Sequence, residues 1–514
     1  MAKQGKTTVV TQQVKFEEFK ADLMAIGLYQ DSRSVPAAFA KLDKAADGKI
    51  ADLLKLGDFA GKANETAVVY VNGKSPCPRV MLVGLGKQED LKLNTLRQAA
   101  GVAARRADRL GAAKVALALH ASVAGFDGEE VGRVLAEGAL AGRYDFRDYV
   151  TQENTNGRKV GDMRITIVEP EAKTLGKIKS GAKLGTIIGE AQNEARRLAN
   201  QPGNEINPPV LAAQARRLAK KFGFVCKVYD EKQLARMKMN AILAVGRGSV
   251  HKPRLIVLEY TGRKGKGGKK AAIDLAVVGK AVTFDTGGVN LKPTPFLDGM
   301  KFDKCGGCAV LGIMSGLARL KAGVNVLGLI PSVENMLSGD SWRPDDIIRT
   351  YSGKTVEVRN TDAEGRMILC DALAFAAERK PEAIIDMATL TGACRVALGE
   401  FYAGLFTNRD ELKDKLLSAA ERSGEPLWHL PSGPQYAEQM KSKVADLKNV
   451  AGREGGACNA AAFLGQFVGE TPWAHLDIAA TADTDEEKPY RAAGATGFGV
   501  RLILQYLEAL GQGS

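Results

Sequence analysis

Hydrophobic and polar residues alternate along the chain with two periods, which predict where strands and helices lie. In the first 180 residues, short β-branched runs bounded by glycine, asparagine or proline are typical of strands. Segments in which apolar residues recur every three or four positions separate them and predict helices. We expect strands at residues 66–71, 80–84, 114–120 and 163–169, and helices at 94–110 and 129–144. This alternation favours a small α/β domain with a largely parallel sheet.

A long helical pattern at residues 184–198 divides the chain in two. It is followed by Pro202 and Gly203, and a helix that ends before such residues suits a rigid connector between domains. The length of 514 residues also exceeds the usual size of a single core. We therefore expect an N-terminal α/β domain at residues 1–180, a linker helix at 181–201 and a larger second domain at 202–514.

The second domain repeats the alternation of strands and helices. We expect strands at 225–229, 254–260, 275–280, 324–330, 383–387 and 473–478, and helices at 209–222, 308–320, 368–379, 412–422 and 502–510. Nearly continuous apolar strands, such as residues 383–385, indicate a sheet covered on both faces. Ligands bind such sheets beyond the carboxyl ends of the strands. Lys280 and Asp285 follow one predicted strand, and residues 389–392 follow another.

Composition narrows the class of protein. Apolar residues make up 45% of the chain and charged residues 25%, as in an ordinary globular protein. No run of about 18 apolar residues predicts a transmembrane helix, and the basic N-terminus lacks the apolar segment of a secretory signal. We therefore expect a cytoplasmic location. The seven scattered cysteines indicate free thiols, and the spacing of Cys305 and Cys308 lacks the second pair or nearby histidine of a zinc site.

The net charge of +13, from 72 basic and 59 acidic residues, favours contact with a polyanion such as nucleic acid. The clearest basic run lies at residues 263–270. Its glycines predict an exposed loop between two strands, and a solvated loop is the interpretation we favour over a nucleic-acid contact.

Four carboxylates carry the strongest chemical indication: Asp285, Asp303, Asp362 and Glu364. Acidic residues at a helix start also offset the helix dipole, which would explain Asp362 and Glu364 but not the other two. The four histidines do not form the paired-histidine motif of zinc proteases, so a metal would depend mainly on carboxylates. Two divalent cations about 3.5–4 Å apart could share bridging carboxylates and activate one water.

Three basic residues lie in the same two stretches. Lys280 could bind a metal only as a neutral amine. Neighbouring cations would lower the pKa of Lys280 and so permit that form. Lys292 suits a developing oxyanion, and the planar fork of Arg366 suits a small oxyanion. The sequence contains no Gly-x-Ser-x-Gly nucleophile motif and no Gly-x-Gly-x-x-Gly dinucleotide motif. With these motifs absent, the remaining hypothesis is two-metal hydrolysis of a carbonyl or a phosphoryl compound. The spacing of the residues does not decide between these two substrates.

Residues 360–366, with the sequence NTDAEGR, resemble the signature of the leucine (cytosol) aminopeptidases, of the bacterial aminopeptidase A type. Residues 280–303, 386–392, 473–477 and 494–497 are similar too, so the resemblance covers essentially all of the second domain. It implies a metal-dependent exopeptidase that removes N-terminal residues, with leucine preferred. The implied fold is a small α/β N-terminal domain and a larger catalytic domain with a central mixed sheet flanked by helices.

The resemblance also implies the metal ligands. Asp285, Asp362 and Glu364 would hold one divalent ion. Lys280, Asp285, Asp303 and Glu364 would hold the other, so that Asp285 and Glu364 bridge the pair. The ions would be manganese or zinc, since the sequence does not identify the metal.

The remaining implied roles concern catalysis and substrate. Lys292 would stabilise the gem-diolate, and Arg366 would hold a bicarbonate that acts as general base. Met300 and Thr389 would line the pocket for the first side chain, and Leu390 and Gly392 would contact the peptide backbone. The resemblance further implies a hexamer of two trimers acting on peptides.

Two other functions stay open. Some bacterial relatives bind DNA, so a DNA-binding architectural or regulatory role is a second hypothesis that can coexist with the enzyme. A binding protein with an inactive site is disfavoured by the complete set of ligands.

The chain departs from the pattern of its relatives at three places. Lys304 stands where methionine is common, and it either adds a cation beside the metals or points away from them. Cys308 replaces alanine, and the loop at 455–459 differs from the commoner isoleucine-threonine form, which leaves the size of the pocket open.

Overall fold

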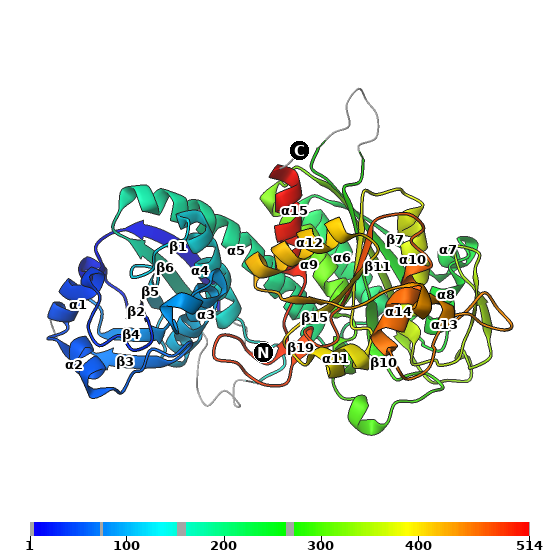
Figure 1. Cartoon of the computed structure of the whole chain (residues 1–514), viewed down its shortest axis with the longest axis horizontal. Helices are drawn as coiled ribbons and strands as arrows, with labels where there is room; N and C mark the ends of the chain where they lie inside the picture. The colour runs from blue at the N-terminus through cyan, green and yellow to red at the C-terminus, as the bar shows by residue number, and fades with distance from the viewer. Residues whose placement is uncertain (1–4, 72–75, 152–160, 264–271, 513–514) are drawn as a thin grey trace. The chain divides into compact units, whose positions relative to one another are not determined.

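The computed structural model describes residues 5–71, 76–151, 161–263 and 272–512, which form two compact units (Figure 1). The first comprises Met1–Asn193 with Asp485–Ala493, and the second comprises Glu194–Thr484 with Gly494–Ser514. The predicted two-domain organisation is thus confirmed, while the boundaries at residues 180 and 202 stay predictions. The predicted basic loop lies, apart from Arg263, outside the described residues.

The first unit is built on a six-stranded sheet of order β1-β6-β5-β2-β4-β3. All neighbouring pairs are parallel except β3 with β4, as the largely parallel prediction requires. The strands are β1 (Thr7–Gln13), β2 (Leu23–Leu28), β3 (Thr66–Tyr70), β4 (Arg79–Gly84), β5 (Lys114–Ala118) and β6 (Met163–Glu169). The pattern did not predict β1 or β2. The second of these is buried throughout, and a short apolar run has no period that separates strand from helix.

Helices α3 (Leu93–Arg109) and α4 (Gly128–Arg143) match their predicted positions, and their apolar faces pack into one core with the sheet. Two shorter helices, α1 (Ala40–Ala45) and α2 (Lys49–Leu56), were not predicted. The predicted linker helix is α5 (Ala172–Asn200), a 29-residue helix that begins earlier than its apolar pattern indicated.

The second unit contains a mixed nine-stranded sheet of order β16-β15-β18-β14-β9-β11-β8-β7, with β10 paired to β11. Its strands are β7 (Val225–Tyr229), β8 (Arg254–Thr261), β9 (Leu275–Gly279), β10 (Ala281–Asp285), β11 (Asn325–Asn335), β14 (Ile384–Ala388), β15 (Ala403–Thr407), β16 (Leu427–His429) and β18 (Trp473–Asp477). Strands β18, β14, β9, β11 and β10 run parallel, whereas β15, β8 and β7 add antiparallel pairs. The mixed sheet expected from the resemblance is confirmed.

The helices of this unit begin near their predicted positions: α6 (Pro208–Phe222), α9 (Cys305–Leu320), α10 (Glu364–Ala377), α12 (Asp410–Ser423) and α15 (Val500–Gln512). Helices α9 and α10 start earlier than predicted, so Glu364 belongs to α10 rather than to the preceding loop. Strands β10, β15 and β16 and the short helices α7 (Glu231–Arg236), α8 (Asn240–Gly246), α11 (Gly392–Leu398), α13 (Pro434–Gln439) and α14 (Gly456–Gly465) were not predicted.

The parallel strands position the candidate site. Strands β9, β11, β14 and β18 are buried along their whole length, as the apolar run at residues 383–385 predicted for a sheet covered on both faces. Because parallel strands end at one edge of a sheet, polar residues that end these strands or directly follow them are brought together there. They are Lys280 after β9, Asp285 in β10, Asn335 in β11, Thr389 after β14 and Asp477 in β18.

Two further expectations concern the chain as a whole. No helix among the described residues is both long and apolar enough to cross a membrane. All seven cysteines are free, as their odd number and scatter predicted.

Candidate metal centre

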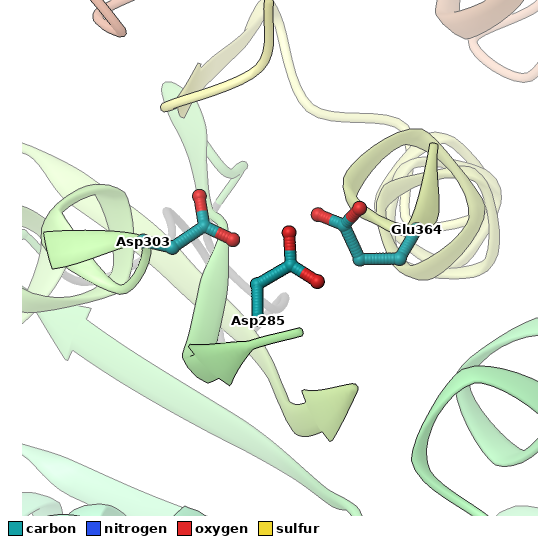
Figure 2. Close-up of side chains that lie close together, drawn as sticks. All are labelled: Asp285, Asp303 and Glu364. Atoms are coloured by element: carbon teal, nitrogen blue, oxygen red, sulfur yellow. The ribbon is translucent and has the colours of Figure 1, made fainter. Parts of the chain in front are cut away.

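Three buried carboxylates converge at the carboxyl edge of the larger sheet. Asp285 ends β10, Asp303 lies between the 3₁₀ helix η7 (Met300–Phe302) and α9, and Glu364 is the first residue of α10. One oxygen from each lies within 4.8 Å of the others. Figure 2 shows the three groups directed toward a common space, with Asp285 between the other two. Oxygen ligands so arranged suit a hard divalent cation.

Two lysines hold these carboxylates in place. The Lys280 Nζ atom lies 2.7 Å from Asp303 Oδ1 and 2.8 Å from Glu364 Oε1. The Lys292 Nζ atom lies 2.8 Å from Asp285 Oδ2 and also forms an ion pair with Asp362. Lys292 therefore joins Asp362, the fourth predicted ligand, to the cluster. The ammonium groups offset the mutual repulsion of the buried carboxylates.

The pKa values reflect this crowding. Burial, reinforced by neighbouring carboxylates, raises the pKa of Asp303 to about 8 and that of Asp362 to about 6. Burial opposes charge on Lys280, but Asp303 and Glu364 outweigh it and raise the pKa of its ammonium. Without a cation Lys280 is therefore protonated, and it must lose a proton before it can act as a ligand. The lowered pKa expected for Lys280 concerns the protein with cations bound, and it stays a prediction.

Arg366 is a buried cation with vacant donors. Its guanidinium donates to the Asn449 backbone oxygen at 2.8 Å, and its Nε has no hydrogen-bond partner. No carboxylate of the described residues forms an ion pair with it, and burial lowers its pKa to about 10, against the opposing charge of Glu364. A buried guanidinium with free donors attracts a small anion.

The backbone of the 360–366 segment is fixed by side chains on both sides. Thr361 is fully buried, and its amide donates to Asn290 Oδ1 at 2.8 Å while its hydroxyl accepts from the Asn290 amide at 2.8 Å. Gly365 leaves room for Lys280, because a Cβ atom at Gly365 would lie 2.7 Å from the Lys280 Cε. Glycine at this position thus lets Lys280 reach the carboxylates.

Of the four residues predicted to contact substrate, one bonds directly to the carboxylate cluster. Thr389 lies at the cluster, because its hydroxyl donates to Asp303 Oδ1 at 2.7 Å. The Leu390 amide donates to Asp477 at 3.2 Å, and Gly392 is exposed at the start of α11. Met300 is half-buried at the start of η7. Their predicted substrate roles stay predictions.

Three buried polar residues of the site were missed by sequence reasoning. Asn335 donates to Asp285, Asn449 holds both the 360–366 segment and Arg366, and Asp477 accepts from the 389–391 backbone. Asp477 lies in the 473–477 segment, which resembles the family, and this resemblance was the only indication in the sequence that Asp477 belongs to the site. Asn335 and Asn449 follow no motif of their own.

Lys304 points away from the carboxylate cluster. It is fully buried, and its ammonium donates to the Ala199 oxygen at 3.0 Å and the Gln201 oxygen at 2.8 Å, at the end of α5, and also to the Lys301 oxygen. Lys304 was expected either to add a cation beside the metals or to point away from them, and the structure shows that it points away. Two of the acceptors, the oxygens of Ala199 and Gln201, lie at the C-terminal end of α5, where cations are favoured.

Cys305 and Cys308 are buried in the first turn of α9. Burial raises the pKa of the Cys308 thiol to about 11 and that of Cys305 well above its usual range. Thiols of high pKa react poorly, so neither cysteine is suited to redox chemistry.

Comparisons with known proteins agree with this geometry. Residues 193–504 match the catalytic domain of the cytosol aminopeptidase family, and residues 25–153 match its N-terminal domain. A probable cytosol aminopeptidase of Aquifex aeolicus is 43% identical over 96% of each chain, and one of Geotalea uraniireducens is 43% identical over 95% of this chain and 97% of its own.

Solved structures are similar over the full chain. A mutant of tomato leucine aminopeptidase has a TM-score of 0.87 and 31% identity, covering 99% of this chain and 98% of its own. The bottromycin maturation enzyme BotP in complex with Mn has a TM-score of 0.82 and 32% identity, covering 96% of this chain and 100% of its own.

Replacing Lys304 by methionine should destabilise the protein without removing its metals. The change removes the hydrogen bonds that Lys304 donates to buried backbone oxygens, which costs about 1–3 kcal/mol, while the ammonium touches none of the carboxylates. Thermal unfolding should therefore shift to lower temperature, and the metal content, measured by elemental analysis, should stay unchanged. Lys220→Met, on the exposed face of α6, is the control and should leave both quantities as they are. Loss of metal in Lys304→Met would contradict this assignment.

Proposed function

Because the chain belongs to the cytosol aminopeptidase family and is a metallo-exopeptidase, we propose that it removes N-terminal residues, leucine preferred, by two-metal activation of water. The observation that carries the proposal is the convergence of Asp285, Asp303 and Glu364 within 4.8 Å. Ion pairs with two lysines do not by themselves account for this cluster. Burying acids and lysines together usually stabilises a fold no better than apolar residues of equal size would.

The donor set fits two divalent ions. Asp303 Oδ2 is buried without a hydrogen-bond partner, so a ligand atom is free beside the cluster. Asp285, Asp362 and Glu364 would hold one ion, and Lys280, Asp285, Asp303 and Glu364 the other. Manganese or zinc would suit these ligands, and manganese is supported by its presence in the structure of BotP. Bound ions would supply a water nucleophile at neutral pH and polarise the scissile carbonyl.

The basic residues would act around this centre. The Lys292 ammonium lies beside Asp285 and Asp362, where it would stabilise the oxyanion that develops on the attacked carbonyl. Arg366, which forms no ion pair with the described carboxylates, would hold a bicarbonate that accepts a proton from water. Both roles need a charged side chain in a fixed position. The ion pairs of Lys292 and the hydrogen bond of Arg366 to the Asn449 oxygen support this.

The substrate would lie along the 389–392 segment. We propose that Met300 and Thr389 line the pocket for the first side chain, and that Leu390 and Gly392 contact the peptide backbone. The position of Thr389 beside Asp303 supports this arrangement, because the pocket must open next to the metals. Helix α14, which starts in the loop of unusual sequence, packs on α11 beyond Gly392 and would bound the pocket.

Removing a ligand carboxylate should abolish activity but not folding. Asp362→Ala should reduce leucine-amide hydrolysis by at least about 100-fold, since loss of an outer-shell partner alone costs metalloenzymes 10–100-fold. Glu364→Gln should lower the metal content, measured by elemental analysis, because Glu364 would bridge both ions. Circular dichroism controls for folding. Full activity in Asp362→Ala would refute its role as a ligand.

We also propose that the protein is a homohexamer of two trimers in the cytoplasm, a location supported by the names of its relatives. Large apolar side chains are exposed around α11: Val396 is 89% exposed, Phe401 75%, and Trp428, in contact with Tyr402, 54%. Exposed apolar groups of this size mark association surfaces.

Light scattering should give six times the chain mass of 54.8 kDa. Phe401→Asp should lower this mass, because it places a charge on the exposed apolar surface. A wild-type protein that runs as a monomer at micromolar concentration would exclude the assembly.

A second function, DNA binding, is favoured by the net charge of +13. If phosphate contacts exist, affinity for duplex DNA should fall steeply as salt rises from 50 to 200 mM, by roughly 10³-fold or more for six or more contacts. Gel-shift titration checks this. Absence of any shift at low salt would remove the hypothesis, while leaving the peptidase proposal intact.

A further inference from the structure

Asn335 is a fully buried amide at the end of β11, and all of its side-chain bonds go to the metal centre or its support. Its Nδ2 donates to Asp285 Oδ1 at 2.8 Å and to the Thr361 backbone oxygen at 3.1 Å. Its Oδ1 accepts from Trp342 Nε1 at 3.2 Å. One side chain thus links β10, the 360–366 segment and a buried tryptophan.

The tryptophan determines which way the amide faces. Trp342 is fully buried, and its indole nitrogen can only donate. The Asn335 oxygen must therefore turn toward Trp342, since the reverse orientation would set two donors against each other. The NH₂ group is left to face Asp285 and Thr361, which offer only oxygen atoms.

This orientation divides the two oxygens of Asp285 between protein and cation. Oδ1 accepts from Asn335 Nδ2 and from the Gly287 amide at 2.9 Å, so two hydrogen bonds occupy it. Oδ2 accepts from no amide, and its partner is the Lys292 ammonium, whose Nζ lies 2.8 Å away. Oδ2 is therefore the oxygen of Asp285 that remains for an ion to share with Lys292.

We propose that Asn335 is a positioning residue, which fixes the Asp285 carboxylate so that Oδ2 is the oxygen left for the cations that the site would hold. It also ties β10, which carries Asp285, to the segment that carries Asp362 and Glu364, so the ligands of the two ions keep a fixed spacing. The inference rests on the proposed two-metal function, in which Asp285 would be a ligand of both ions.

The test is calorimetric titration of Mn²⁺ into the full-length, metal-free protein. Asn335→Ala should weaken both ions, by roughly 10–100-fold each, the usual cost of losing a partner that orients a ligand. Thr389→Val, which removes the hydroxyl bonded to Asp303, should weaken only the ion held by Asp303. The contrast between the two variants separates a bridge from an ordinary ligand.

Ser332→Ala is the matched control. Ser332 lies on the same strand, is fully buried, and its hydroxyl has no hydrogen-bond partner, so its loss should leave both affinities unchanged. Thermal unfolding of each metal-free variant shows whether the protein is folded at the titration temperature. If Asn335→Ala does not fold, Trp342→Phe replaces it, because it keeps an aromatic ring but removes the donor that orients the amide. It should also weaken both ions.

The proposal is overturned if a folded Asn335→Ala, or Trp342→Phe in its place, binds both ions as tightly as wild type, or weakens one ion alone. Failure of the proposed function is seen separately, as wild-type protein that binds fewer than two Mn²⁺ ions.

Discussion

Carboxylates that are buried side by side repel one another, and the larger unit is organised around holding them together. Asp285, Asp303 and Glu364 come from three different elements, and burial makes their charges costly. Two kinds of compensation are present. Lys280 and Lys292 supply opposite charge, while the buried amides of Asn335 and Gly287 supply hydrogen bonds. The parallel strands bring Lys280, Asp285 and Asn335 to one edge of the sheet, and the other groups reach it from helix starts and loops.

The same ion pairs bear on how a cation would bind at this centre. The ammonium of Lys280 bonds two carboxylates that a cation would otherwise bond. Metal binding therefore competes with a proton at this position, as is general where ligands must be deprotonated.

The sequence predicted those parts of the fold that local pattern determines. Strand β7 was placed at its observed limits, and the alternation of strands and helices gave the two-domain α/β organisation. The 360–366 segment was recognised because its residues are adjacent in the chain. Strand β10 was missed because five residues, two of them polar, carry too little periodicity.

The supporting residues could not be predicted, because their roles arise from contacts across long stretches of chain. Asn335 meets Asp285 across 50 positions, and Asn449 meets Asn360 across 89. Nothing in the local sequence of an asparagine distinguishes such a contact from a turn. The direction of Lys304 likewise depends on where α5 ends, more than 100 positions earlier.

Lys304 has a consequence for exchanging parts between this protein and its relatives. The residues around positions 199–201 and Lys304 form a matched pair, in which the first supply buried backbone acceptors and Lys304 supplies the donor that satisfies them. A chimera that takes one segment from a methionine-bearing relative and keeps the other would join incompatible halves. The two segments should therefore be transplanted together, and their substitutions in natural variants should depend on each other.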